Sequence, residues 1–246
     1  MSDVSRRKWL RAGLASAAGV TGVAAAATLA DRYGLITPGH AGIYGVGDSL
    51  TYAAQRLLTE HSMAREFSRD QISKNPFPNC KAPKLKEYES QQAAGFDDWK
   101  INIGGLVAKP GSLSLRELKQ YPAASQITHL ACEEGWSFIA EWTGATLSHV
   151  LHEFGIRPEA RFVVYHSLEK DWWDSIDMAD ALHPQTQLTY AMNGAPLPPG
   201  HGGPIRMRVP RQLGYKSIKF VTRITVTDNL KQQFSPEGSY SWYAGI

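Results

Sequence analysis

Apolar residues recur at the spacing of an α-helix in two segments of the chain, residues 49–59 and 147–154. Side chains three or four positions apart share one face of a helix, so both segments predict amphipathic helices. Gly155 is expected to end the second helix, because glycine readily adopts the left-handed backbone of a helix C-cap. The residues that set the spacing are Leu50, Ala53, Ala54, Leu57 and Leu58, and then Leu147, Val150, Leu151 and Phe154.

Two shorter helices are indicated by the residues at their ends. Ser114 and Glu117 have the spacing of a capping box, which predicts a helix that Pro122 ends. A loop rich in Asp and Trp is expected from Lys170 to Ser175. The helix after this loop is expected to run to about Leu182, where a nearby proline stops it.

Strands are predicted where apolar and polar positions alternate or where a short apolar run stands between turn residues. In the last such stretch Ile218, Phe220, Ile224 and Val226 alternate, so they are expected on one face of a strand. Prolines exclude a helix from residues 74–84, which we interpret as an irregular arm. Helices and strands together predict an α+β fold. The expected strands are 99–107, 161–167, 186–192, 205–210 and 217–227.

The N-terminus resembles a twin-arginine export signal. Arg6 and Arg7 precede Trp9 and Leu10, and residues 12–30 carry no charge. This run is long enough to remain as a membrane anchor, so both cleavage and anchoring stay open. We expect a folded protein exported to the periplasm by the twin-arginine machinery. The predicted organisation is a signal or anchor over 1–31, a helix and a Pro-rich arm over 32–94, and one domain over 95–246.

Charge and cysteine content limit the possible functions. The formal net charge of the 246 residues is only +3, which gives no indication of nucleic-acid binding. Of the two cysteines, Cys80 and Cys132, neither belongs to a Cys-x-x-Cys pair. That pattern argues against a structural zinc site and against a thioredoxin-type redox motif. A disulfide between the two cysteines stays open for a protein in an oxidising periplasm.

Successive motifs between residues 95 and 228 resemble those of the sulfite oxidase family of molybdenum enzymes. The closer resemblance is to the bacterial periplasmic branch that includes methionine-sulfoxide reductase catalytic subunits. It implies a mixed-sheet molybdopterin-binding oxidoreductase domain with a molybdenum–molybdopterin cofactor. The motifs are His129–Trp136, Glu141–Leu147, Met192–Pro198, His201–Arg206 and Gly214–Lys219.

The resemblance assigns Cys132 as the thiolate ligand of molybdenum, beside the dithiolene sulfurs of the pterin. A soft thiolate suits a redox transition metal, and it must remain unpaired to serve as a ligand. Other positions match residues that bind the cofactor. They are His201 and Arg206 at the pterin and its phosphate, Ser217, the Ile218 backbone and Lys219 at the phosphate side, the Ser167 hydroxyl, and either Asn75 or Asn79, between which spacing does not decide.

Glu134 matches a catalytic glutamate of the metal pocket, and it could relay protons if burial raised its pKa. We expect Glu133 to face solvent or to cap a turn, Trp136 and Trp142 to form walls, and Trp172 with Trp173 to line a substrate funnel or a partner surface.

The acidic neighbours of Cys132 disfavour a dianion such as sulfite as the substrate. No haem motif is present in the sequence, so electrons must pass to or from a partner, either a cytochrome or a membrane haem b protein. The implied reaction is oxygen-atom transfer, or a related two-electron conversion, on a small-molecule substrate, and its direction is open. Two alternatives remain: an exported binding module of the same fold without redox activity, and an anchored structural protein held by a disulfide.

Overall fold

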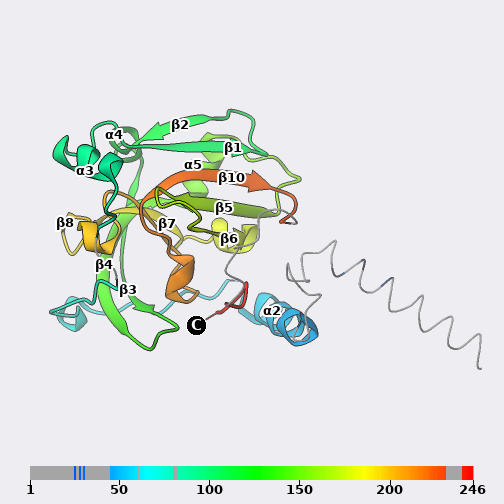
Figure 1. Ribbon diagram of the computed structural model, residues 1–246. Coiled ribbons are helices and arrows are strands. Elements are labelled where there is room, and N and C mark those ends of the chain that lie inside the picture. Colours follow the sequence, from blue (N-terminus) through cyan, green and yellow to red (C-terminus); the bar gives the residue numbers. More distant parts are fainter. Residues whose placement is uncertain are drawn as a thin grey trace, which may run out of the picture. The chain divides into compact units, whose positions relative to one another are not determined.

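The computed structural model describes residues 25, 28, 30, 45–59, 61–79, 82–230 and 240–245 (Figure 1). Apart from residues 25, 28 and 30, the expected export signal lies outside this part, and so does Cys80. The chain divides into two compact units, Met1–Leu58 and Thr59–Ile246. Helix α2 spans Gly45–Thr59 and confirms the helix predicted over 49–59. Within the described residues, no helix has both the length and the apolar content needed to cross a membrane.

The second unit contains two sheets that confirm the α+β class. The first has the strand order β2-β1-β10-β5-β6, and the second has the order β3-β4-β7-β8 with β9 paired to β7. β1 runs parallel to β10, whereas the other pairs in that sheet are antiparallel, so the sheet is mixed. The strands are β1 Lys100–Gly105, β2 Gly111–Ser114, β3 Ala123–Ala131, β4 Ser137–Thr146, β5 Phe162–Ser167, β6 Trp173–Asp177, β7 Gln187–Met192, β8 Ala195–Pro196, β9 Arg206–Arg208 and β10 Val221–Thr227.

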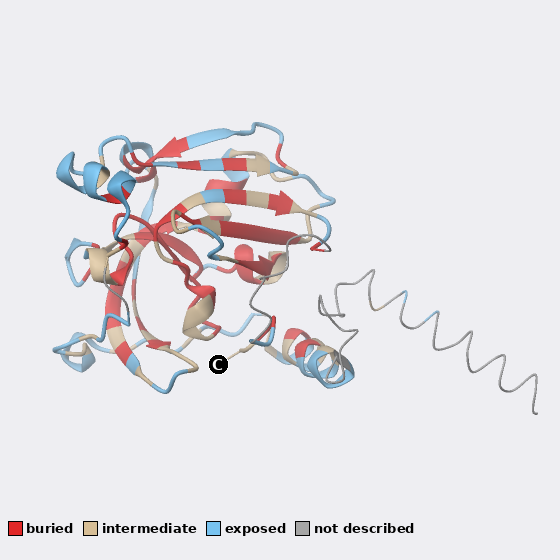
Figure 2. Ribbon diagram, viewed as in Figure 1, coloured by how far each residue is buried: buried red, intermediate tan, exposed pale blue. Residues whose placement is uncertain are grey.

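Short helices connect the strands, and the main core takes residues from both sheets. Ile101, Val163 and Ile224 of the first sheet share this core with Leu188 of β7 and Leu151 of α5. Figure 2 shows buried positions along the strands of both sheets, while α3 is largely exposed. The helices are α3 Lys86–Ala93, α4 Leu115–Leu118, α5 Leu147–Glu153 and α6 Met178–Ala181, with 3-10 turns η1 Arg69–Gln71, η2 Pro199–His201 and η3 Gly214–Lys216.

The helix ends have the predicted chemistry. The Glu117 backbone N–H donates to Ser114 Oγ at 3.1 Å, and the Ser114 N–H donates to the Glu117 carboxylate at 2.8 Å, which completes the capping box. Gly155 follows α5 with a φ of +69°, the left-handed conformation expected after its end. The capping box and the glycine after the helix each depend only on residues a few positions apart, so both can be predicted from the sequence alone.

Two predicted boundaries were wrong. The loop expected over Lys170–Ser175 ends earlier, because β6 begins at Trp173 and buries Asp174, whose carboxylate receives a hydrogen bond from Lys216. The strand expected over residues 217–227 begins only at Val221. Phe220 has a φ of +55°, outside the extended region, so the chain turns before the strand starts.

The predicted arm contains no helix in its described part, residues 74–79 and 82–84. The segment before it is fixed to the second sheet, since Glu66 forms a bridge with Thr128 and the Ser73 N–H donates to the Ile139 carbonyl at 2.9 Å. The arm then brings Phe77 against Trp136, with ring centroids 5.3 Å apart. It therefore supplies part of the site from a region far from the motifs in sequence.

Candidate functional site

A cavity of about 380 Å³ lies where the β3–β4 turn, η2, β9 and η3 meet. This volume falls within the usual range of small-molecule and cofactor pockets. Its wall combines one thiol, several cations, several carboxylates and aromatic rings. Residues predicted for the site that line it are Cys132, Glu134, His201, Arg206, Ser217, Ile218, Lys219 and Asn79.

Cys132 follows the last residue of β3, at the start of a tight turn. Its N–H donates to the Trp136 carbonyl at 3.0 Å, and its carbonyl accepts from the N–H of Gly135, whose φ is +90°. The thiol is free, which removes the disulfide alternative for this residue. Its sulfur lies 3.3 Å from Glu133 Oε2 and 3.8 Å from Glu134 Oε2.

Burial, reinforced by the two adjacent carboxylates, raises the pKa of the Cys132 thiol to about 11. The thiolate is therefore disfavoured at neutral pH unless a positive charge compensates it. A bound metal supplies that charge, because a coordinating thiol loses its proton. Among the described residues, no group of three or more His, Cys, Asp or Glu side chains is placed to hold a metal ion.

Two cations, Arg206 and Lys219, also line the cavity. The Arg206 guanidinium is 4% exposed and donates to the carbonyls of His201 at 2.9 Å and Ser217 at 2.7 Å. Lys219 Nζ donates to the Gly200 carbonyl at 2.6 Å and to Asn79 Oδ1 at 3.1 Å. Burial, together with the charges of Arg206 and Lys219, lowers the pKa of His201 to about 4, so this imidazole is neutral at pH 7.

The turn at η3 is packed directly against the end of β3. A Cβ added to Gly214 would lie 3.1 Å from the Ala131 carbonyl oxygen, which is tighter than almost all real Cβ contacts. Glycine at this position therefore permits the close approach that brings Ser217 and Ile218 into the same cavity as Cys132.

The structure separates the two asparagines and displaces Ser167. Asn79 lines the cavity and accepts a hydrogen bond from Lys219, whereas Asn75 is exposed and does not line it. Ser167 lines a neighbouring polar cavity instead, and its hydroxyl accepts from the Glu169 N–H at 3.1 Å. Ser167 is the last residue of β5, and the predicted hydroxyl contact therefore has no counterpart in the lining of the main cavity.

Both glutamates beside Cys132 line the cavity, although only Glu134 was expected to do so. Glu133 was expected to face solvent or to cap a turn, but it lines the cavity and hydrogen-bonds to Tyr240. Glu134 lines the cavity as expected, yet it is exposed, and Trp136 Nε1 donates to its carboxylate at 2.7 Å.

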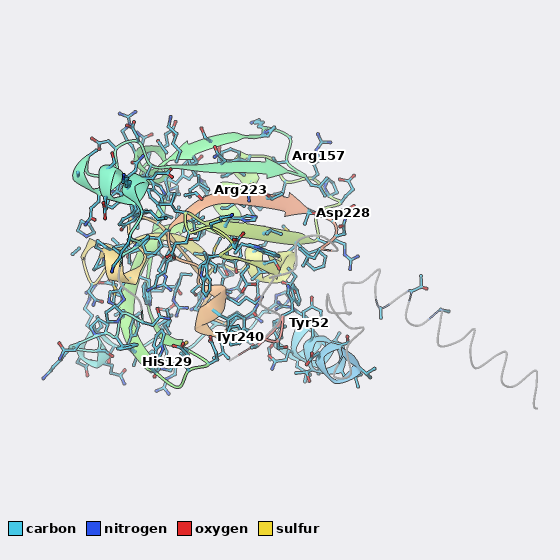
Figure 3. The ribbon with its side chains drawn as sticks, in the orientation of Figure 1. Tyr52, His129, Arg157, Arg223, Asp228 and Tyr240 are labelled. Carbon is cyan, nitrogen blue, oxygen red and sulfur yellow. The ribbon has the colours of Figure 1, made fainter. Side chains whose placement is uncertain are left out.

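Several cavity residues were not predicted to belong to the site. Phe77, Phe138, Glu169, Tyr215 and Tyr240 line the cavity, and Tyr240 stacks on Tyr215 with ring centroids 5.0 Å apart. Figure 3 labels Tyr240 beside η3. Phe77 and Tyr240 lie outside the span of the motifs, and no local pattern marks them. Trp136, expected to be a wall, and Trp172, expected at a funnel or partner surface, line the cavity, whereas Trp142, also expected to be a wall, is fully buried and is not among the lining residues.

This arrangement defines a class of protein. A single thiol, suited to a soft metal, and a cluster of cations line one cavity that is large enough for an anionic cofactor. The donor set therefore fits a metal cofactor that carries its own sulfur ligands and a phosphate. The class is a cofactor-dependent oxidoreductase domain on an α+β fold.

Comparison with known proteins agrees with this class. A family profile described as "Oxidoreductase molybdopterin binding domain" matches residues 88–235. The putative protein-methionine-sulfoxide reductase subunit YedZ1 of Azospira oryzae is 33% identical over 189 residues, which cover 77% of this chain and 70% of that protein. The protein-methionine-sulfoxide reductase catalytic subunit MsrP of Xanthomonas axonopodis pv. citri is 32% identical over 186 residues, 69% of this chain and 58% of that protein.

The sulfane dehydrogenase SoxCD of Paracoccus pantotrophus shares the fold. Its crystal structure matches with a TM-score of 0.54 and 21% identity, covering 69% of this chain and 46% of that one. The chain belongs to the family of oxidoreductase molybdopterin-binding domains. The expected molybdenum–molybdopterin cofactor and the expected class of enzyme, an oxidoreductase of the sulfite oxidase type, are thereby confirmed.

Proposed function

We propose that this protein removes an oxygen atom from a sulfoxide, using electrons from a haem-containing partner in the periplasm. The observation that carries the proposal is the free Cys132 thiol, which lines one cavity together with Arg206 and Lys219. When bound, the molybdenum cofactor supplies the two-electron redox chemistry. Removing one oxygen atom from a sulfoxide consumes two electrons and two protons and releases one water.

The residues of the chain divide the work of holding the cofactor. Cys132 provides one sulfur ligand from the tight turn after β3. Arg206, Lys219 and the Ser217 hydroxyl carry charge and hydrogen-bonding groups for the phosphate side. His201, neutral because of burial and the adjacent cations, can accept as well as donate at the pterin.

The mouth of the cavity favours a neutral substrate with an apolar body. Phe77, Trp172 and Tyr240 are 50%, 44% and 45% exposed and line the cavity, so they offer aromatic surface to an incoming group. Glu133 and Glu134 place carboxylates beside Cys132, where they oppose a dianion such as sulfite. A sulfoxide is neutral, and the names of the two methionine-sulfoxide reductase relatives support this class of substrate.

The proton supply and the electron supply have different sources in this proposal. Glu134 lies 3.8 Å from the Cys132 sulfur but is exposed, so it does not meet the condition of burial for a proton relay, and protons enter the cavity from solvent. Electrons come from a partner, either a cytochrome or a membrane haem b protein. The Arg6–Arg7 motif with its uncharged run supports export of the folded, loaded protein to the periplasm, with cleavage or anchoring both compatible.

Protein from a host that makes the molybdenum cofactor tests the proposal. We expect about one molybdenum per chain, oxidation of a reduced dye by methionine sulfoxide, and no reduction of an oxidised dye by sulfite. Cys132→Ser should lose molybdenum and turnover, and Cys80→Ser, at the only other cysteine in the sequence, is the matched control. Wild-type protein that carries no molybdenum would refute the cofactor role of the cavity. Loaded protein without sulfoxide turnover would refute the substrate class and favour the binding-module alternative.

A further inference from the structure

A buried arginine behind the cavity has no part in the function described above. Arg208 is 0% exposed, although it stands in a strand where a buried position normally holds an apolar side chain. Burial and the nearby Arg206 lower its pKa to about 9, which leaves it charged at neutral pH. Within the described part of the chain, Arg208 forms no ion pair with a carboxylate, and its Nε has no hydrogen-bond partner.

The contacts of Arg208 join two segments that carry separate parts of the site. Nη2 donates to the His129 carbonyl at 2.5 Å and lies 3.3 Å from Thr128 Oγ1, both on β3, which leads into Cys132. Nη1 lies 3.5 Å from the Ser217 hydroxyl, in the turn that lines the phosphate side. Figure 3 labels His129, which lies near the end of β3.

These contacts also determine how the Ser217 hydroxyl can be used. Its oxygen accepts from the Val209 N–H at 3.2 Å as well as from Arg208. A hydroxyl oxygen that accepts two hydrogen bonds retains its own hydrogen for donation. Because Ser217 lines the cavity, that hydrogen is available to an anionic group inside it.

Trp142 holds the two arginines of β9 in a fixed relation. The guanidinium carbons of Arg206 and Arg208 each lie 5.3 Å from the centre of its ring. Alternate residues of a strand point to the same face, so Arg206 and Arg208 share this tryptophan. The indole N–H donates to the Thr128 carbonyl at 3.3 Å, which ties the same tryptophan to β3.

We infer that Arg208 is a positioning residue, whose bridge from β3 to Ser217 sets the separation between the Cys132 sulfur and the phosphate-side donors. The inference rests on the proposed cofactor role of this cavity. A guanidinium can hold several acceptors in one plane, whereas an ammonium offers a compact point charge. Retention of the cofactor therefore depends on the fork of Arg208 and not on its charge alone.

Arg208→Lys keeps the charge and removes the fork, and Arg208→Met removes both. Arg211→Met is the matched control, because Arg211 is also buried, at 5% exposed, but pairs with Asp180 at 3.7 Å and does not line the cavity. Each protein is purified from a host that makes the cofactor, and the loss of molybdenum during dialysis is followed by elemental analysis. Urea unfolding of the cofactor-free forms measures any loss of fold stability separately.

We expect both Arg208 variants to lose molybdenum about 10-fold to 100-fold faster than the wild type, the usual effect of removing a group that orients a metal site. Arg211→Met should retain molybdenum even if its fold is equally destabilised. Combining Arg208→Lys with Ser217→Ala should add less than the sum of the two single effects, since both act on one hydroxyl.

The inference would be overturned if Arg208→Lys retained molybdenum as the wild type does. It would also be overturned if Arg211→Met, at matched fold stability, lost molybdenum as fast as the Arg208 variants, or if the effects of Arg208→Lys and Ser217→Ala on molybdenum loss were fully additive. In each of these cases wild-type protein still carries molybdenum, so the proposed function stands. Wild-type protein without molybdenum would overturn the proposed function and this inference together.

Discussion

Lys216 and Asp174 form a buried ion pair beneath the turn that carries Ser217. Lys216 Nζ donates to Asp174 Oδ1 at 2.6 Å and to the Ser175 carbonyl at 2.8 Å, and the two side chains are 1% and 11% exposed. Burial raises the pKa of Asp174, and the Lys216 ammonium opposes that shift. Lys216→Met removes the opposing charge and leaves the carboxylate buried.

Removing one partner of a buried pair costs about 3–5 kcal/mol, because the other charge remains out of water. In Lys216→Met the pKa of Asp174 should rise further above its unfolded value. The folded protein then holds a proton that the unfolded chain releases, so the variant should lose stability as pH rises from about 4 upward. Lys216→Met combined with Asp174→Asn should recover much of the loss, since no buried charge remains.

Urea unfolding of the cofactor-free proteins, followed by far-ultraviolet circular dichroism at pH 5 and pH 8, measures these free energies. Lys100→Met is the control, because Lys100 is an exposed lysine of β1 and its replacement should change stability by about 0.5 kcal/mol or less. A cost below about 1 kcal/mol for Lys216→Met at pH 8, or a double variant as unstable as the sum of the singles, would refute the reasoning.

Three further predictions concern the cavity in purified protein. Because the pKa of Cys132 is about 11, this thiol in the folded, cofactor-free protein should react with iodoacetamide at pH 8 about 100-fold more slowly than in protein unfolded by urea. Peptide-resolved mass spectrometry measures both rates, and equal rates would contradict the burial of the thiol. The pKa of His201 is about 4, so the unfolded chain binds a proton that the folded one does not between pH 6.5 and 4. The free energy of unfolding should therefore decrease as the pH falls from 6.5 to 4. In urea unfolding, His201→Gln should reduce this decrease by up to about 3 kcal/mol, and an unchanged dependence on pH would contradict the prediction. Gly202→Ala places a Cβ 2.8 Å from Lys219 Cγ and 3.2 Å from Arg206 Cβ, so molybdenum content should drop, while Gly194→Ala, with positive φ but open space, should retain it.

The elements found from sequence depend on short-range patterns. α5, the capping box at Ser114 and the strands β5 and β7 all follow from residues within a few positions of one another. β6 was missed because its polar Asp174 finds a partner 42 residues away in Lys216, and an isolated sequence window contains no trace of that pairing. Hydrophobic periodicity predicts a strand from its buried apolar side chains. It does not predict a strand whose buried position holds a charged side chain in an ion pair.

In the candidate site too, the residues within sequence motifs were predicted, and those placed by tertiary packing were not. The motif residues Cys132, His201, Arg206 and Lys219 line one cavity, as the resemblance implied. The choice between Asn75 and Asn79 required the path of the arm, and the role of Tyr240 required a stack on Tyr215 from the far end of the chain. Such residues come from segments whose position is decided by tertiary packing, and spacing in the sequence does not encode it.

The charge distribution explains why the folded domain is suited to receive its cofactor. Arg206 and Arg208 are both buried and share Trp142, while the carboxylates of Glu133 and Glu134 stand beside a thiol whose pKa burial raises to about 11. Two like charges on one side and a suppressed thiolate on the other are each unfavourable alone. An anionic group in the cavity, against Arg206 and near Arg208, and a metal cation against the sulfur relieve both at once. Because the folded chain alone holds these groups in place, binding must also stabilise the fold, by an amount that grows with affinity. The same residues that raise the electrostatic cost of the cofactor-free domain are therefore those that make its loading favourable.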